Sequence, residues 1–120
     1  MERQEDDRRI PVSAMNGAIV ASLQSALTPQ LLQWLRDDLL GAAARHRARL
    51  AVLDLAGLTG LDRLEYLDIV DTARMLQLMG VRTVLAGTRP GIIAGLSALG
   101  ADMAALPGAC DLESALAYDR

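Results

Sequence analysis

The chain has 120 residues, 52% of them apolar and 2% aromatic, and a formal net charge of −3. This length fits one domain with an aliphatic core. The acidic balance and the low aromatic content argue against nucleic-acid binding, which needs basic patches and stacking surfaces. All 12 basic residues are arginine, so lysine chemistry is excluded, and a single cysteine and a single histidine make a poor metal site. We therefore expect no cofactor and no metal.

The expected location follows from the N-terminus and from the apolar runs. Residues 1–9 are charged, lack the apolar core of a signal peptide, and are expected to form a flexible tail. No apolar run approaches the roughly 20 residues that cross a bilayer. Cys110 has no cysteine to pair with, which suits a reducing compartment. We expect a cytoplasmic protein with one domain over residues 10–118 and no membrane partner.

The first half of the chain predicts a hairpin followed by a helix. Residues 10–14 suit an edge strand because Pro11 cannot donate a hydrogen bond to a neighbour. Asn16-Gly17 predicts a tight turn, and residues 18–23 predict the returning strand. Thr28-Pro29 predicts a helix start, and apolar residues at helical spacing extend that helix to about residue 47.

The second half alternates strands and helices. Residues 50–55 form an apolar run typical of a strand buried on both faces. Asp62 and Glu65 have the spacing of a capping box for a helix to about residue 79. The pattern then predicts a strand at 81–86, a turn at 87–91, a helix at 92–99, a weak strand at 103–106 and a helix at 111–117. This order predicts an α/β fold: a mostly parallel sheet with an N-terminal hairpin and four helices packed on it.

Four stretches of the sequence, taken in order and with their spacing, carry a likeness to a known family. They are the strand-to-helix junction Leu58–Asp62, Ser22–Thr28 with Asp37–Leu40, Leu76–Leu85, and Gly87–Pro90 followed by Leu96 and Leu99-Gly100. Over about residues 10–118 the chain resembles the STAS family, the sulfate-transporter and anti-sigma-factor antagonist domains. Within that family the likeness is to the small single-domain antagonists of the stressosome.

The resemblance implies the STAS fold and a non-enzymatic regulatory protein. Such antagonists act in bacterial stress signalling, where they bind scaffold STAS proteins and a serine/threonine switch kinase, or an anti-sigma factor, in large assemblies. Two alternatives stay open: a stand-alone anti-sigma-factor antagonist and a ligand-sensing STAS module. An enzyme is disfavoured because the sequence offers neither a nucleophile–histidine pair nor a nucleotide-binding loop.

The resemblance also marks a switch position. In the family, the residue after the aspartate of this junction is commonly a serine or threonine that a partner kinase phosphorylates; here it is Arg63. The implied partner-binding residues are Thr59, Asp62, Arg63, Thr88 and Arg89. In one interpretation Arg63 locks the site against phosphorylation and pairs with an acidic residue of a partner. In the other, Arg63 is a solvated surface residue and regulation lies elsewhere.

Other hydroxyl groups could take the place of the missing phosphoacceptor. Thr59 and Thr88 lie in loops that follow neighbouring strands, and Ser97 lies on the predicted third helix. A structural role is the alternative for each, because serine and threonine often cap helices and close turns.

The helix predicted after Asp62 is apolar around most of its circumference. One ridge suffices to pack a helix on a sheet, so a second ridge indicates another contact. Leu64, Leu67, Met75 and Leu78 form the candidate assembly face of a homo-oligomer or larger complex. The alternative is a thick core beneath neighbouring helices. Asp68 and Asp71 are expected on a solvated face.

Overall fold

The strands form one sheet in which spatial order follows chain order. The computed structural model describes residues 9–24, 27–98, 108–109 and 116–117. Within them lie β1 (Val12–Met15), β2 (Ala18–Gln24), α2 (Pro29–His46), β3 (Leu50–Gly57), α3 (Arg63–Leu78), β4 (Arg82–Ala86), α4 (Pro90–Ala98) and β5 (Gly108–Ala109). The five strands described run β1-β2-β3-β4-β5. The β1–β2 pair is antiparallel and the other pairs are parallel, as the sequence predicts.

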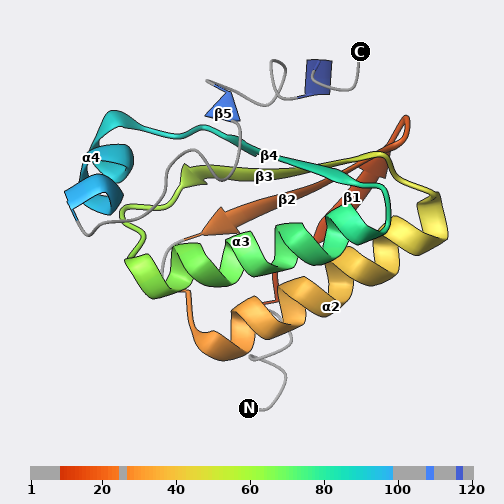
Figure 1. Ribbon diagram of the computed structural model, residues 1–120, viewed down its shortest axis with the longest axis horizontal. Coiled ribbons are helices and arrows are strands. Elements are labelled where there is room, and N and C mark those ends of the chain that lie inside the picture. The colour runs from red at the N-terminus through yellow and green to blue at the C-terminus, as the bar shows by residue number, and fades with distance from the viewer. Residues whose placement is uncertain (1–8, 25–26, 99–107, 110–115, 118–120) are drawn as a thin grey trace.

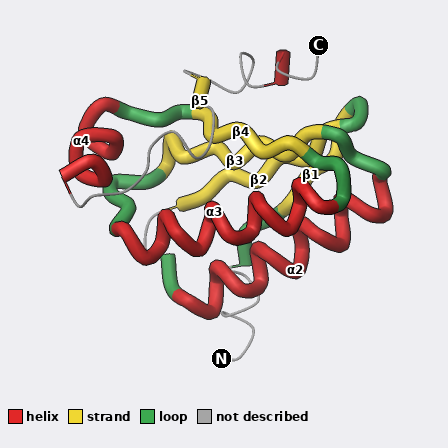
Figure 2. The backbone as a smooth tube through the Cα atoms, in the orientation of Figure 1, coloured by secondary structure: helices red, strands yellow, loops and turns green. Residues whose placement is uncertain are grey.

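The main core lies between the sheet and its helices. In Figure 1, α2 and α3 run side by side along one face, and α4 lies beyond the carboxyl ends of β3 and β4. The same layers are visible in the tube view (Figure 2). The core joins side chains of all these elements, among them Leu23, Leu39, Leu53, Leu55, Tyr66, Ile69, Leu76, Ile92 and Leu96.

The opposite face of the sheet carries a smaller apolar cluster. Its residues are Ala18, Val20, Leu50, Val52, Val84 and Ala86, with Leu116 packed against them. Strand β3 contributes to both clusters, so the prediction of a strand covered on both faces is confirmed.

Local sequence signals account for the hairpin and for the ends of α2. Asn16 and Gly17 both have positive φ, 49° and 83°, as a tight hairpin turn requires. Thr28 caps α2 by accepting a hydrogen bond from the backbone N–H of Leu31 at 3.1 Å, and Pro29 is the first helical residue. Arg47 closes the helix in the left-handed conformation. Strand β1 begins at Val12 rather than at the predicted residue 10.

An arginine from α2 joins the two long helices. The Arg36 guanidinium donates to Asp68 Oδ1 at 2.5 Å and to Thr72 Oγ1 at 3.2 Å. The expectation that Asp68 lies on a solvated face is therefore wrong, since it is half-buried between α2 and α3. Its neighbour Asp71 is exposed, as expected.

A second arginine attaches the start of the described chain to α2. Arg9 donates to Asp38 at 2.7 Å, and its guanidinium lies 5.1 Å from the centre of the Trp34 ring. An exposed pair of this kind stabilises by no more than about 1 kcal/mol.

Two predicted C-terminal elements fall largely outside the described residues. The weak strand at 103–106 does so entirely, and of the fourth helix at 111–117 only residues 116–117 are described. The sheet does gain a short fifth strand, β5, whose Gly108 and Ala109 pair with Leu85 and Ala86. Among the described helices, none has the length and apolar character needed to cross a bilayer.

Candidate functional site

The loop between β3 and α3 is anchored on both sides and exposed in the middle. Leu58 and Leu61 are buried, with 1% and 8% of their surface accessible, whereas Thr59 and Gly60 between them are exposed. The backbone N–H of Leu58 donates to the carbonyl of Leu55 at 3.0 Å, which turns the chain at the end of the strand. The two leucines thus hold a short exposed tip at the carboxyl edge of the sheet.

Helix α3 begins directly after this tip with the predicted capping box. The backbone N–H of Glu65 donates to Asp62 Oδ1 at 2.7 Å, and the backbone N–H of Asp62 donates to Glu65 Oε1 at 2.9 Å. Two N–H groups that the helix itself leaves unpaired are therefore satisfied.

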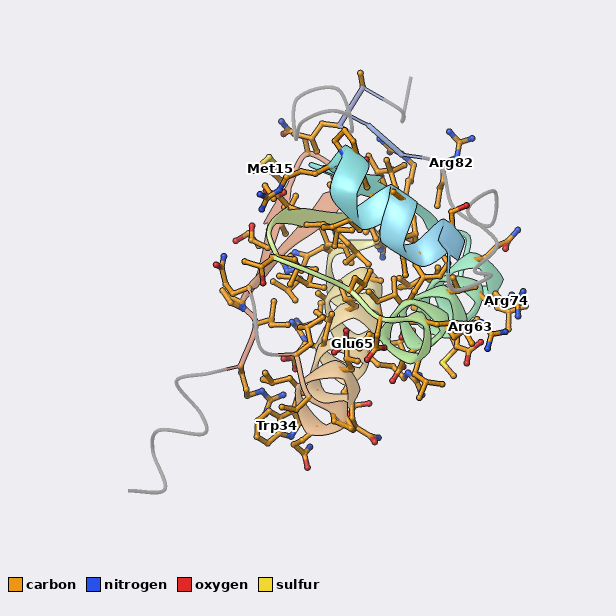
Figure 3. The ribbon with its side chains drawn as sticks, turned by 90° about the vertical axis from the view of Figure 1, so that its left-hand side faces the viewer. Met15, Trp34, Arg63, Glu65, Arg74 and Arg82 are labelled. Carbon is orange, nitrogen blue, oxygen red and sulfur yellow. The ribbon has the colours of Figure 1, made fainter. Side chains whose placement is uncertain are left out.

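Arg63 is the first residue of α3, and its side chain is exposed. Figure 3 shows it projecting outward on the same side of the helix as Arg74. A cation here is disfavoured by the helix dipole by about 0.3–1 kcal/mol, and the neighbouring carboxylates of Asp62 and Glu65 offset part of that cost.

Arg89 ties the β4–α4 loop to the β3–α3 loop. Its Nη2 donates to the carbonyl of Ala56 at 2.5 Å and to the carbonyl of Leu58 at 2.7 Å. The sequence suggests Arg89 as a partner-binding residue, and the structure gives its guanidinium an internal role. The sequence could not predict this tether, because the acceptors are backbone carbonyls far along the chain: Leu58 is 31 residues from Arg89 and Ala56 is 33 residues from it.

Gly87 allows the two loops to approach this closely. Its φ is +67°, and a Cβ placed on it would lie 2.9 Å from the Cβ and N of Ala56 and 2.9 Å from Asp54 Oδ1. That carboxylate oxygen already accepts the backbone N–H of Ala56 at 3.0 Å. The ends of β3 and β4 therefore pack backbone against backbone, so the loops they carry form one surface.

The three candidate alternative phosphoacceptors differ in exposure. Thr59 is exposed at the loop tip, Thr88 is half-buried beside Gly87, and Ser97 is exposed on α4. Across the part of the chain that the structure describes, no three His, Cys, Asp or Glu side chains gather where they could hold a metal ion.

The candidate assembly face lies along the outer side of α3. Leu64 and Leu78 are 75% and 90% exposed, and Leu67 and Met75 are each 38% exposed. The other apolar ridge of α3, which includes Tyr66, Ile69 and Leu76, is buried in the core. The second ridge is therefore not covered by the described part of the chain.

Replacing Asp62 with alanine is expected to lower the free energy of unfolding by about 1 kcal/mol, because the Glu65 N–H loses its acceptor. Chemical unfolding followed by circular dichroism measures the loss. Asp62→Ser is the matched control, since a serine hydroxyl can also cap. Equal stability of all three proteins would show that the capping box contributes nothing.

One curated protein and several solved structures are similar to this chain. No protein-family model matches the sequence. Among curated proteins, the RsbT co-antagonist protein RsbRA of Bacillus subtilis (strain 168) is 25% identical over 84 residues, or 70% of this chain. The chain spans about a third (31%) of the length of that relative.

Solved structures extend the likeness to nearly the whole chain. An RsbS variant of Moorella thermoacetica matches with a TM-score of 0.78 and 22% identity, covering 92% of this chain and 93% of its own. A chain of a structure that describes the molecular architecture of the stressosome matches with a TM-score of 0.73 and 20% identity. The match covers 90% of this chain and 94% of that chain. The unphosphorylated anti-sigma-factor antagonist SpoIIAA matches with a TM-score of 0.67 and 16% identity, covering 92% and 96%. The predicted STAS fold is confirmed.

Proposed function

We propose that this chain is a non-enzymatic antagonist of the stressosome type, acting in the cytoplasm, that binds scaffold STAS proteins and a serine/threonine switch kinase. Its structural neighbours include RsbS, a stressosome chain and SpoIIAA, and its curated relative is a co-antagonist of RsbT. The observation that carries the proposal is the joined loop surface at the start of α3, where an exposed tip precedes an exposed Arg63.

Arg63 gives this surface a charge that a kinase cannot change at that position. Phosphorylating a hydroxyl there would add a charge of about −1.5 to −2 at a helix N-terminus. Arginine has no hydroxyl and carries a charge of +1. Among the described residues, Arg63 has no ion pair, and the neighbouring Asp62 and Glu65 carboxylates accept the capping hydrogen bonds. We propose that its guanidinium pairs with a carboxylate of the partner.

Affinity capture of the tagged protein from its native cytoplasm tests this proposal, with Arg63→Ser compared in parallel. The native protein is expected to recover STAS scaffold proteins and a serine/threonine kinase. The variant is expected to carry phosphate on the introduced serine after incubation with that kinase. Gln77→Ser is the matched control, because it places a serine at an exposed position of α3 away from the loop.

Two results would contradict parts of the proposal. Recovery of neither scaffold nor kinase would remove the stressosome assignment and favour a ligand-sensing module. Phosphate on Thr59, Thr88 or Ser97 of the native protein would show that the switch operates through another hydroxyl, and that Arg63 does not fix the state of the surface.

A further inference from the structure

The outer side of α3 carries residues at heptad spacing that the described part of the chain leaves exposed. Leu64, Leu67, Asp71, Arg74 and Leu78 follow one another at spacings of three and four residues. At 3.6 residues per turn these five positions fall within about 80° of arc. All five are exposed, Asp71 and Arg74 with 59% and 73% of their side-chain surface accessible. Alternating three- and four-residue spacing is that of the core positions of a coiled coil. We call these five residues the α3 seam.

Four residues of the α3 seam, Leu67, Asp71, Arg74 and Leu78, complement one another across two copies in one orientation, whereas Leu64 lies beyond the overlap of the two helices. When a second α3 lies antiparallel, with the two-fold axis between Thr72 and Ala73, Leu67 of each copy faces Leu78 of the other. In the same register, Asp71 of each copy faces Arg74 of the other. The contact then has two leucine layers outside and two opposite-charge layers inside. A parallel arrangement would place Asp71 against Asp71 and Arg74 against Arg74.

The side chains of Asp71 and Arg74 can form ion pairs with a second copy of the chain. Within one chain, Asp71 and Arg74 are 3.9 Å apart and mostly solvated, so their mutual attraction is weak. Figure 3 shows Arg74 pointing away from the body of the protein. By contrast, Asp68 on the same helix is already held by Arg36.

We infer that the α3 seam binds a second copy of this chain in antiparallel orientation and forms a two-fold symmetric dimer. Such an interface uses the same patch on both copies, which is why the pattern must complement itself. A partner of uniform charge would leave either Asp71 or Arg74 facing its own sign. The seam is short and lies below the standard interface size, so the dimer is expected to depend on protein concentration. The inference extends the assembly part of the proposed function, and it is tested on the purified chain alone.

The test uses Asp71→Arg and Arg74→Asp, alone and mixed, in sedimentation velocity. The native protein is expected to form dimers as its concentration rises. Each single variant places like charges across the axis and is expected to weaken self-association by at least about tenfold. The equimolar mixture of the two variants restores both opposite-charge layers, so dimers are expected to return. The double variant Asp71→Arg/Arg74→Asp is expected to dimerise as the native protein does.

The controls separate the seam from folding and from other contacts. Circular dichroism verifies that the variants are folded. Gln77→Arg adds a charge at an exposed position outside the seam and is expected to leave the dimer unchanged. A native protein that stays monomeric, or a mixture that stays monomeric while the native protein dimerises, would overturn the inference. Either result leaves the loop surface and its capture experiment unaffected.

Discussion

Replacing Gly87 with alanine is expected to lower the free energy of unfolding by about 2–4 kcal/mol. The left-handed backbone at this residue, with φ of +67°, disfavours a side chain. The added methyl group would also lie 2.9 Å from the backbone N of Ala56, which is too close for either atom to remain in place. Urea unfolding monitored by circular dichroism measures the change, which also tests how tightly the two loops are joined.

Gly80→Ala is the matched control for this substitution. Gly80 also has a positive φ, +83°, but a Cβ added to it would meet no neighbouring atom within 4 Å. Only the backbone cost of about 1–2 kcal/mol is therefore expected. Equal losses in the free energy of unfolding for the two variants would show that the close approach of Gly87 to Ala56 adds nothing to the cost of a side chain at position 87.

Replacing Leu58 with alanine is expected to destabilise the protein by about 2–5 kcal/mol, the range for removing a buried leucine side chain. Leu58 is 1% exposed and forms the strand-side anchor of the β3–α3 loop. Its removal leaves a space beneath the exposed tip at Thr59 and Gly60. Urea unfolding gives the size of the loss, and hydrogen exchange is expected to show faster opening of the loop and the first turn of α3.

Leu64→Ala removes the same atoms six residues later and serves as the control. Leu64 is 75% exposed, so a change within about ±0.5 kcal/mol is expected, measured at a concentration where the chain is monomeric. If Leu58→Ala is no more destabilising than Leu64→Ala, burial of the Leu58 side chain does not anchor the loop whose exposed tip the proposed function uses.

Local signals make most of the fold predictable. Asn16-Gly17 specifies a turn that few other dipeptides can form, and Asp62 with Glu65 specifies a helix start through hydrogen bonds three residues apart. The apolar run of β3 indicates burial on both faces without any knowledge of its neighbours. These features depend on residues close in sequence, which is why the sequence alone reveals them.

The contacts that define the site depend on residues far apart in sequence. Neither the tether from Arg89 to the carbonyls of Ala56 and Leu58 nor the link from Arg36 to Asp68 has a local signature. The spacing of Asp68 from Asp71 suggests a common polar face in solvent. Asp68 is instead half-buried, because α2 lies against that side of α3.

The agreement between spatial and chain order of the strands bears on how the protein is made. Because the strands run β1-β2-β3-β4-β5, each strand pairs with the one synthesised immediately before it. During translation, each finished strand can dock on an edge that already exists, and no early strand waits for a late one. The sheet can therefore be assembled strand by strand from β1 during synthesis. Among the described strands, β5 pairs last and covers the edge of β4.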